Sequence, residues 1–409
     1  MVFLLVTLTA IACTNDTKNE NLFVCKQHEY FGYKDSVGEK ISLNDIRNNA
    51  THLEDLAYMH YVLQNNFPLL YTAYWGMALN INEVFAYLYG ELHYGEEITD
   101  EEFFFLLSDS FAPMINIGHF GIHSFDFLPR QSYYIANSND MYFEFPPTVS
   151  SSVIIDGQVA YLQASNFFNL EDWGEYLPNL IEFYTRIENY EHLIVDLRGN
   201  IGGWNRLFDE HILLPASSRE RLAIEMYILF FNGDYSPPFA SETFIGVMRS
   251  VPMGIRFIDR EPMLLAHILQ ESYLPELRVS DREYYVLRAE YVFVSDAQVR
   301  NGLENINFNG KVWLLIDERV GSGAQIATFV AKESGFATLV GEPTWGNWGG
   351  FNAVIARMPN SHIRFRFDPG MVLNSRGYSI EAGIRPHHPN RPGMCALETT
   401  LALIAEGNY

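Results

Sequence analysis

The chain has 409 residues, 48% of them apolar and 19% charged, which is the composition of a globular protein of two or three domains. These fractions exclude an intrinsically disordered or collagen-like chain. Asp and Glu outnumber Lys and Arg by 50 to 27, so the net charge of −23 repels phosphate backbones and argues against a nucleic-acid partner.

A targeting segment is expected at the start of the chain. Val2 to Ala12 form a run of small and apolar residues that is too short to span a bilayer, which needs about 20 residues. The run fits the apolar core of a signal peptide, so we expect residues 1–12 to be removed. Small residues precede Cys13, as in a bacterial lipoprotein cleavage site, and Cys13 is therefore the expected lipidation site.

This interpretation makes the protein an exported lipoprotein of a bacterial cell envelope, either periplasmic or on the surface. The lipid on Cys13 is the only expected contact with a membrane, because no later stretch is long and apolar enough for a membrane helix. The alternative is that the first residues are a disordered apolar start on a cytoplasmic protein.

The first part of the mature chain is expected to be helical. Residues 13–41 are read as a polar tether and lead-in, while residues 42–112 carry apolar side chains at helical intervals and predict an N-terminal helical domain. Two pairs of threonine and glutamate, three residues apart, have the spacing of capping boxes at helix starts. These pairs are Thr51 with Glu54 and Thr99 with Glu102.

Residues 113–409 are expected to form an α/β core. Apolar strands alternate with helical stretches there, and this order predicts parallel strands joined by right-handed crossovers. The expected strands are 159–167, 192–197 and 311–317, and the expected helices are 175–190, interrupted near its start by Pro178, and 324–334. Residues 216–308 show no clear pattern and are interpreted as a mixed segment inserted in the core.

Two glycine-rich loops, each directly after an apolar strand, are the strongest functional signal. They are DLRGNIGG, Asp196–Gly203, and DERVGSGAQ, Asp317–Gln325. Glycines let the backbone turn tightly and leave N–H groups facing a ligand, and ligands bind at the carboxyl ends of parallel strands. Ser322 lies at the expected start of a helix, where the dipole favours a developing negative charge. Ser322 is alternatively a helix N-cap, although the first loop favours a functional role.

The common cofactor and metal motifs are absent from the sequence. There is no GxxxxGK[ST], HExxH or CxxC motif, and the adjacent His387 and His388 beside prolines are interpreted as part of a solvated loop. We therefore expect neither a cofactor nor a metal. In the first glycine-rich loop, Asp196 and Arg198 are expected to form a structural ion pair.

The two loops and a third segment, LVGEPTWG at Leu339–Gly346, resemble the tail-specific and tricorn-type serine peptidases. The resemblance covers most of the mature chain and implies a crotonase-like βαβ core. In the tail-specific branch a lysine activates the serine, but its position is Asn347 here and Lys332 does not match it. That branch also carries a PDZ module, for which the chain between His119 and Val159 is too short.

The tricorn-type branch instead uses a histidine and a glutamate with its serine. Its histidine follows a glycine in a turn after the helical region, which matches His119, and its glutamate segment near the C-terminus matches Glu381. The resemblance implies that Ser322 is the nucleophile, that His119 is the general base and that Glu381 orients the imidazole.

The same resemblance implies the groups that stabilise the oxyanion. These are backbone N–H groups of Gly323, next to the nucleophile, and of Gly202 or Gly203 in the first loop. His119 suits the role of the base because the reference pKa of histidine is about 6.5. His123 is the rival base, although a histidine in a core or on a surface is the more frequent interpretation of such a residue.

The sequence therefore predicts an exported serine peptidase that hydrolyses peptide or protein substrates through an acyl-enzyme. A first alternative is a catalytically inactive crotonase-like protein that binds peptides or apolar ligands. An activated Ser322 distinguishes an enzyme from such a binding protein. A second alternative is another crotonase-type acyl transfer, such as thioester chemistry. The export signal argues against this alternative, as does the absence of a sequence signature for an adenine-diphosphate site.

Overall fold

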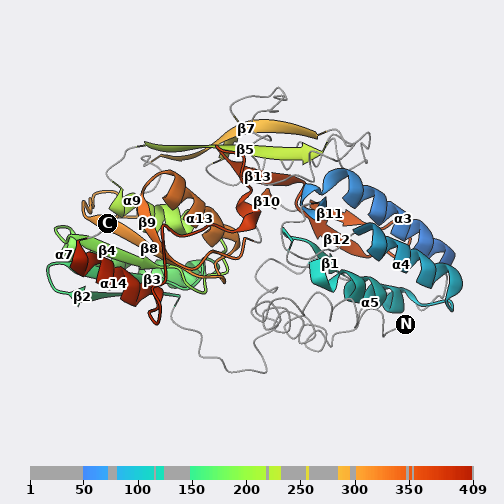
Figure 1. Ribbon diagram of the computed structural model, residues 1–409, viewed down its shortest axis with the longest axis horizontal. Coiled ribbons are helices and arrows are strands. Elements are labelled where there is room, and N and C mark those ends of the chain that lie inside the picture. The colour runs from blue at the N-terminus through green and yellow to red at the C-terminus, as the bar shows by residue number, and fades with distance from the viewer. Residues whose placement is uncertain are drawn as a thin grey trace. The chain divides into compact units, whose positions relative to one another are not determined.

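The structure, a computed structural model, falls into two compact units that are each built from segments far apart in sequence (Figure 1). Unit 1 comprises Met1–Glu144, Glu276–Ser280 and Ala353–Phe367, and unit 2 comprises Phe145–Pro275, Asp281–Asn352 and Asp368–Tyr409. Within these bounds the structure describes residues 49–71, 81–114, 117–123, 148–217, 221–231, 255–257, 284–294, 301–346, 350–351 and 354–407.

Helices and one small sheet make up unit 1. The helices are α3 (Asn49–Asn66), η1 (Pro68–Tyr71), α4 (Ile81–Tyr94), α5 (Asp100–Phe111) and η3 (Ala112–Met114). The antiparallel sheet has the order β1-β12-β11, with β1 at Gly121–His123, β11 at Val354–Arg357 and β12 at Arg364–Phe367. The helices agree with the apolar periodicity of the sequence. Strands β11 and β12 were expected in the core from the sequence, but β12 pairs with β1 and β11 pairs with β12 in this unit.

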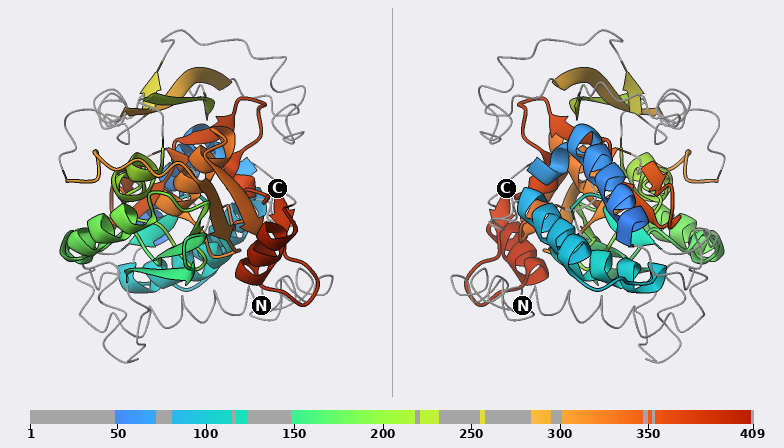
Figure 2. Two further views of the ribbon diagram at one scale, coloured as in Figure 1. Left: turned by 90° about the vertical axis from the view of Figure 1, so that its left-hand side faces the viewer. Right: turned by 90° about the vertical axis from the view of Figure 1, so that its right-hand side faces the viewer.

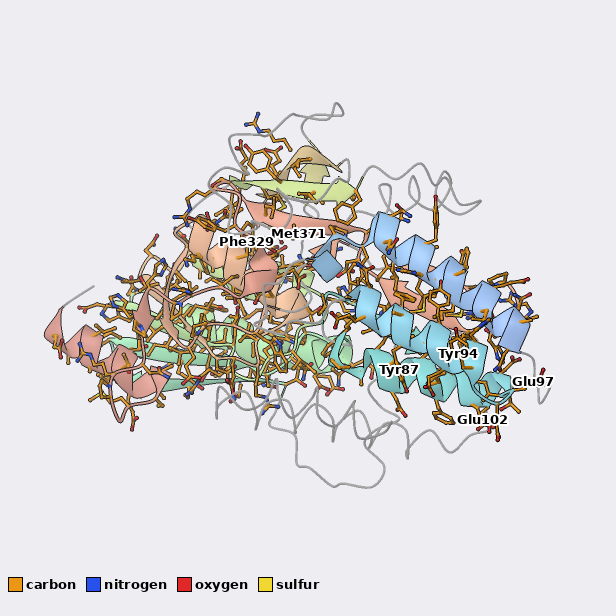
Figure 3. All side chains as sticks on the ribbon, turned by 45° about the vertical axis from the view of Figure 1, so that its right-hand side comes forward. Tyr87, Tyr94, Glu97, Glu102, Phe329 and Met371 are labelled. Carbon is orange, nitrogen blue, oxygen red and sulfur yellow. The ribbon has the colours of Figure 1, made fainter. Side chains whose placement is uncertain are left out.

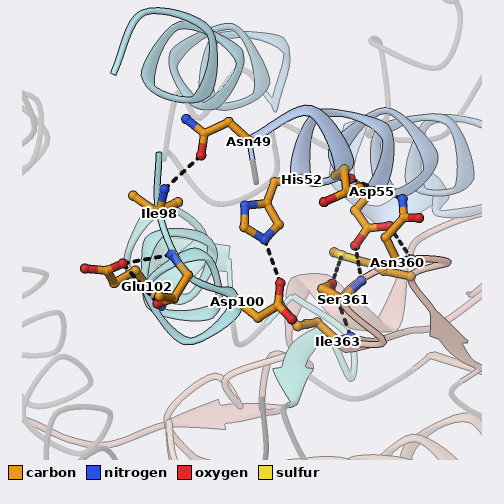
Figure 4. Close-up of polar contacts among 12 residues, drawn as sticks. Asn49, His52, Asp55, Ile98, Asp100, Glu102, Asn360, Ser361 and Ile363 are labelled. Atoms are coloured by element: carbon orange, nitrogen blue, oxygen red, sulfur yellow. Dashed lines mark hydrogen bonds and ion pairs between the residues drawn. The ribbon is translucent and has the colours of Figure 1, made fainter. Parts of the chain in front are cut away.

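The start of α5 carries the capping box that its sequence predicts (Figure 4). Glu102 N–H donates to Thr99 Oγ1 at 3.2 Å, and Thr99 N–H donates to Glu102 Oε2 at 2.8 Å. The cap expected at Thr51 is wrong, because α3 already includes Asn49 and Thr51 lies inside the first turn. Thr51 and Glu54 therefore lie within the helix, where residues three apart are neighbours on one face.

Two buried polar contacts hold α3 within unit 1 (Figure 4). The Asp55 carboxylate accepts the N–H groups of Asn360 and Ser361 at 2.8 and 2.7 Å, which ties α3 to the loop between β11 and β12. His52 and Asp100 lie 2.7 Å apart through Nε2 and Oδ1 and tie α3 to the start of α5. These contacts explain how a segment near residue 360 joins the N-terminal helices.

A six-stranded, mostly parallel sheet is the centre of unit 2. Its order is β14-β9-β8-β4-β3-β2, and only the edge strand β2 is antiparallel. The strands are β2 (Val149–Ile155), β3 (Val159–Ala164), β4 (His192–Asp196), β8 (Lys311–Ile316), β9 (Ala337–Gly341) and β14 (His388–Pro389). The α/β fold with parallel strands at β3, β4 and β8 is confirmed.

Three helices accompany this sheet. Helix α7 (Leu170–Ile187) connects β3 to β4, α13 (Ser322–Glu333) connects β8 to β9, and α14 (Ala396–Glu406), the dark red helix of Figure 2, packs on β8 and β9. Helix α7 is not interrupted at Pro178, contrary to the sequence analysis. Pro178 is exposed, so water can hydrate the carbonyl that loses its partner, while the buried face of the helix holds it together.

A five-stranded antiparallel sheet completes unit 2, in the order β10-β13-β5-β7-β6. Its strands are β5 (Arg221–Phe231), β6 (Ile255–Phe257), β7 (Tyr284–Val294), β10 (Gly350–Phe351) and β13 (Gly370–Asn374). The segment without a clear sequence pattern therefore supplies two long paired strands. Met226 to Phe231 are all buried, and a strand buried on both faces does not alternate between apolar and polar residues. No helix among the described residues is long and apolar enough to cross a membrane.

Candidate active site

The two glycine-rich loops lie next to each other in unit 2. They follow β4 and β8, which are neighbouring parallel strands, so both loops leave the same edge of the sheet. Two hydrogen bonds join them. Gly199 N–H donates to Asp317 Oδ1 at 2.9 Å, and Gly321 N–H donates to Asn200 O at 3.1 Å.

Only glycines allow the loops to approach as closely as they do. A Cβ atom at Gly202 would lie 2.5 Å from Ser322 Cβ and 2.6 Å from both Gly321 O and Gly323 N. A Cβ atom at Gly323 would lie 2.2 Å from Gly203 O. The first loop is therefore packed directly on the backbone around Ser322.

Ser322 has an unusual backbone conformation at the start of α13. Its φ is +49°, one of two positive values among the described residues other than glycine. Such a conformation is strained and persists only where its surroundings enforce it. A sharp strand-to-helix turn of this kind exposes the serine of other hydrolases at the end of a sheet. Gly321 is the N-cap of α13, so the interpretation of Ser322 as the N-cap is wrong.

Helix α13 is held firmly behind Ser322. It buries most of its side chains, including Phe329, which is labelled in Figure 3 and is 2% exposed. Gln325, one turn after Ser322, is fully buried and its Nε2 donates to Ile380 O at 2.7 Å. This bond attaches α13 to the short helix η5 (Ile380–Ala382).

Glu381 lies in η5 and is 2% exposed. Its N–H donates to Ser379 Oγ at 3.2 Å, which fixes the start of η5. Thr344, in the third motif of the sequence, binds the segment that follows: Ile384 N–H donates to Thr344 Oγ1 at 2.7 Å, and Thr344 N–H donates to Ile384 O at 3.1 Å. The loops after β8 and β9 and the Glu381 segment are thus linked within unit 2.

His119 belongs to unit 1, in the turn before β1. Phe120 N–H closes this turn on Ile117 O at 3.1 Å, and Gly118 has a φ of +56°, which suits a glycine. The His119 carbonyl accepts a hydrogen bond from Arg366 Nε at 2.7 Å, so β12 holds the turn. The His119 ring is half-buried.

His123, the rival base, has the wrong acidity for that role. Desolvation, with a smaller effect of the Arg366 charge, lowers the pKa of His123 to about 3. A base of that strength accepts a serine proton far less readily than one with a pKa near 7. His123 also folds back over its own strand, because a Cβ atom at Gly121 would lie 3.2 Å from His123 Nε2.

The model of peptidase family S41 matches residues 158–389, more than half of the chain, and this range includes the glycine-rich loops, Ser322 and Glu381. The chain belongs to peptidase family S41. It is therefore a serine-type peptidase, and the resemblance to the tail-specific and tricorn-type peptidases is confirmed. A comparison with curated protein sequences gives no match.

Two solved structures are similar to this S41 peptidase over most of its length. A "putative peptidase" from Parabacteroides merdae is 14% identical over 86% of this chain and 96% of its own, with a TM-score of 0.52. A lipoprotein from Streptococcus agalactiae is 11% identical over 87% of this chain and 96% of its own, with a TM-score of 0.45. The first of these likenesses supports the α/β fold.

In the S41 peptidase, the three candidate oxyanion donors differ in their hydrogen bonding. Gly202 N–H already donates to Asn200 Oδ1 at 2.8 Å. No hydrogen bond of Gly203 N–H or Gly323 N–H occurs among the residues that the structure describes. Gly323 N–H belongs to the first turn of α13, where backbone N–H groups have no partner within the helix.

Asn200 shapes the first loop, although it was not among the residues predicted from the sequence. Its side chain is fully buried, accepts the Gly202 N–H two residues ahead, and donates through Nδ2 to Ala164 O at 2.9 Å. The signal was present, because asparagine next to glycine often bonds to the backbone two residues on. Gln325 was also missed, since a buried amide in an otherwise apolar helix has no periodic signature.

The expected ion pair between Asp196 and Arg198 is confirmed. Arg198 Nη2 and Nε lie 2.6 and 2.9 Å from the two carboxylate oxygens of Asp196, and Tyr161 OH donates to Asp196 Oδ2 at 2.7 Å. The hydrogen bonds to Asp196 raise the pKa of Arg198, so the guanidinium stays charged. Its role is to anchor the base of the first loop.

Lys332 is not placed to serve as the base of the S41 peptidase. It lies near the end of α13, where its Nζ donates to Arg385 O at 2.7 Å. Cys13 and Asn347 lie outside the described residues. No group of His, Cys, Asp and Glu among the described residues could hold a metal ion.

Proposed function

We propose that this S41 peptidase hydrolyses peptide bonds through an acyl-enzyme on Ser322, with His119 as the general base and Glu381 orienting it. The observation that carries the proposal is the conformation of Ser322. A serine held at φ +49° on the first residue of a helix, with a glycine loop packed against it, is arranged for attack rather than for capping.

The proposed reaction has two stages. His119 takes the proton of the Ser322 hydroxyl as its oxygen attacks the carbonyl carbon of the scissile bond, and the imidazolium then gives that proton to the leaving amine. A water molecule, deprotonated by His119, next attacks the carbonyl carbon of the acyl-enzyme. This step releases the carboxylic acid product and restores the Ser322 hydroxyl. Glu381 stabilises the imidazolium and fixes its tautomer.

We assign the oxyanion to the N–H groups of Gly203 and Gly323. Gly202 N–H already donates to Asn200 Oδ1, so we assign Gly202 a different role. Because it has no side chain, the first loop can pack directly against Ser322. Two preorganised N–H donors, of which that of Gly323 lies at the N-terminus of α13, favour the negative charge that develops on the carbonyl oxygen.

We infer further that unit 2 is a crotonase-like core of the tricorn-type branch without a PDZ module. The parallel strands β3, β4, β8 and β9, the helices α7 and α13 between them, and the order of the three sequence motifs support this inference. Peptides or proteins are the proposed substrates, and no cofactor takes part in the proposed steps.

A pH–rate profile tests the role of Glu381. Activity requires neutral His119, so the rate is expected to rise with pH and then level off, and a carboxylate that orients the ring would move this rise to higher pH. In Glu381→Gln the midpoint is expected to fall and kcat to drop by about 10²-fold.

Glu182→Gln is the matched control for this profile, since Glu182 is an exposed carboxylate on α7 in the same unit. Its profile is expected to follow that of the unmodified protein. An unchanged midpoint and a kcat within about twofold for Glu381→Gln, a difference of only about 0.4 kcal/mol, would remove Glu381 from the triad.

We also propose that the protein is exported and lipidated on Cys13. Mass spectrometry of protein isolated from its native host is expected to find Cys13 as the first residue, carrying fatty acyl groups. Replacement of Cys13 by serine is expected to leave residues 1–12 attached. An intact Met1 in the unmodified protein, or a first residue beyond Cys13, would contradict this proposal.

A further inference from the structure

A helical segment with a widened turn follows the first glycine-rich loop directly. It runs through α8 (Arg206–Phe208), the π-helical turn η4 (Asp209–Leu213) and α9 (Leu214–Ala216). π-Helical turns are rare and often occur at functional sites. The turn begins with Asp209, an acid that the proposed reaction does not use.

Asp209 is buried together with a tyrosine from a different sheet. The Asp209 side chain is 8% exposed, and its Oδ2 accepts a hydrogen bond from the hydroxyl of Tyr291, which lies in β7 and is 1% exposed. The Tyr291 hydroxyl in turn accepts a hydrogen bond from Asn205 Nδ2 at 3.1 Å. Asn205, Tyr291 and Asp209 thus form a chain in which each donor points towards the acid.

The side chain of Asn205 binds Tyr291 and does not cap the helix that follows it. Asn205 is the N-cap of α8, a position where asparagine normally accepts a backbone N–H of the first turn. Its side chain makes no such bond and donates to Tyr291 instead. The side chain therefore serves the contact with Tyr291 rather than the start of the helix.

Stability alone does not account for Asp209 at this position. Its second oxygen, Oδ1, has no hydrogen-bond partner among the described residues. Burial raises the pKa of Asp209 to about 7; the bond from Tyr291 and the charge of Arg206 act against this shift, and Glu210 adds to it. A buried acid with one oxygen unsatisfied destabilises a fold, and an apolar side chain of similar volume would be more favourable.

The other end of the chain reaches the backbone beside the nucleophile. Asn205 follows Gly203 by two residues, and a Cβ atom at Gly323 would lie 3.2 Å from Asn205 N. Trp204 N–H donates to Phe167 O at 2.8 Å, so this part of the loop is held by Tyr291 of β7 on one side and by Phe167, three residues after β3, on the other. A shift of Asn205 would therefore move Gly203 relative to Gly323.

We propose that Asp209 and Tyr291 are positioning residues, which hold Asn205 and thereby set the distance between the two oxyanion donors, Gly203 and Gly323. This proposal rests on the function proposed above. It predicts that removal of the Tyr291 hydroxyl lowers kcat and leaves KM nearly unchanged, because the donors act on the transition state.

The test compares Tyr291→Phe with Tyr184→Phe. Tyr184 is the matched control, since it is also fully buried in unit 2 and its hydroxyl has no hydrogen-bond partner among the described residues. We expect Tyr291→Phe to lower kcat on a peptide substrate by about 10- to 100-fold with KM within about threefold, and Tyr184→Phe to leave both unchanged.

Further variants at Asp209 and Asn205 separate positioning from folding. Asp209→Asn keeps an oxygen that accepts the Tyr291 hydroxyl, whereas Asp209→Leu removes it, so we expect Asp209→Leu to lose about tenfold more kcat than Asp209→Asn. Asn205→Ala combined with Tyr291→Phe is expected to be little worse than either change alone, because the three residues act as one chain. Melting temperatures of all variants show whether each is folded at the assay temperature.

A kcat for Tyr291→Phe within twofold of the control would overturn the proposal, as would equal losses in kcat for Asp209→Asn and Asp209→Leu. The proposal would also be overturned if the losses of kcat from Asn205→Ala and Tyr291→Phe added fully in the double variant. Failure of the underlying function has a different signature: Ser322→Ala would then retain activity. If Ser322→Ala is inactive while Tyr291→Phe is normal, only the positioning proposal is wrong.

Discussion

Replacing Ser322 by alanine is expected to lower kcat for hydrolysis of labelled casein by about 10⁶-fold, the loss found when the nucleophile of a serine peptidase is removed. Alanine lacks the hydroxyl on which we propose that the acyl-enzyme forms. Ser322 is partly exposed and the change removes a single oxygen atom, so the variant is expected to fold normally with an unchanged melting temperature.

The matched control for this change is Ser152→Ala. Ser152 is an exposed serine in β2 of the same unit and lies outside both glycine-rich loops. Its activity is expected to equal that of the unmodified protein. Residual activity in Ser322→Ala of more than about a hundredth would show that a different residue carries the reaction.

Replacing Gly202 by alanine is expected to lower kcat by at least about 10³-fold, comparable to the loss of an oxyanion donor. The new Cβ atom would lie 2.6 Å from two backbone atoms, Gly321 O and Gly323 N, which cannot move without displacing Ser322 and α13. Gly202 also has a φ of +102°, which alanine rarely adopts. A lower melting temperature is expected for the same reason.

Gly199→Ala is the matched control in the same loop. Gly199 also has a positive φ, +76°, but a Cβ atom there would meet no atom within 4 Å. That variant therefore carries only the backbone penalty of about 1–2 kcal/mol and is expected to keep kcat within about threefold. Equal losses of kcat in both variants would mean that backbone strain, and not the contact with Ser322, explains the effect.

The parallel strands of unit 2 could be predicted because they are buried on both faces. His192 to Leu197 and Lys311 to Asp317 are continuous apolar runs that each end in an acid and a glycine-rich loop, and this pattern is typical of a strand with a functional carboxyl end. The helix that begins at Ser322 could be predicted because apolar residues recur in its sequence at helical intervals. The strain at Ser322 could not be predicted, since it arises from the loop packed against it.

The antiparallel sheet could not be predicted from the sequence, for a different reason. Strands β5 and β7 pair over eleven residues each, but Met226 to Phe231 of β5 are all buried, and burial on both faces removes the alternation that identifies a strand. Strands β11 and β12 join β1 from more than 200 residues away, and local sequence holds no information on such a pairing. The contact of Asp55 with Asn360 and Ser361 is equally remote in sequence.

Among the candidate site residues, those in glycine-rich loops could be located from the sequence, because glycine marks the places where backbones approach each other. Asn200, beside Gly199 in the first loop, had such a signal as well, whereas Asp209 had none, since its proposed role depends on side-chain contacts across the fold. His119 and Glu381 were located only through the family resemblance. No periodicity or spacing joins two residues that lie 262 positions apart.

Reaction with a fluorophosphonate probe tests most directly whether Ser322 is an activated nucleophile. The probe phosphonylates serines that a neighbouring base activates, and peptide mapping by mass spectrometry identifies the modified residue. We predict a single adduct on the peptide that contains Ser322, no adduct in Ser322→Ala, and normal labelling in Ser152→Ala. An adduct on another residue, or equal labelling of Ser322→Ala and the unmodified protein, would contradict the assignment of Ser322 as the nucleophile.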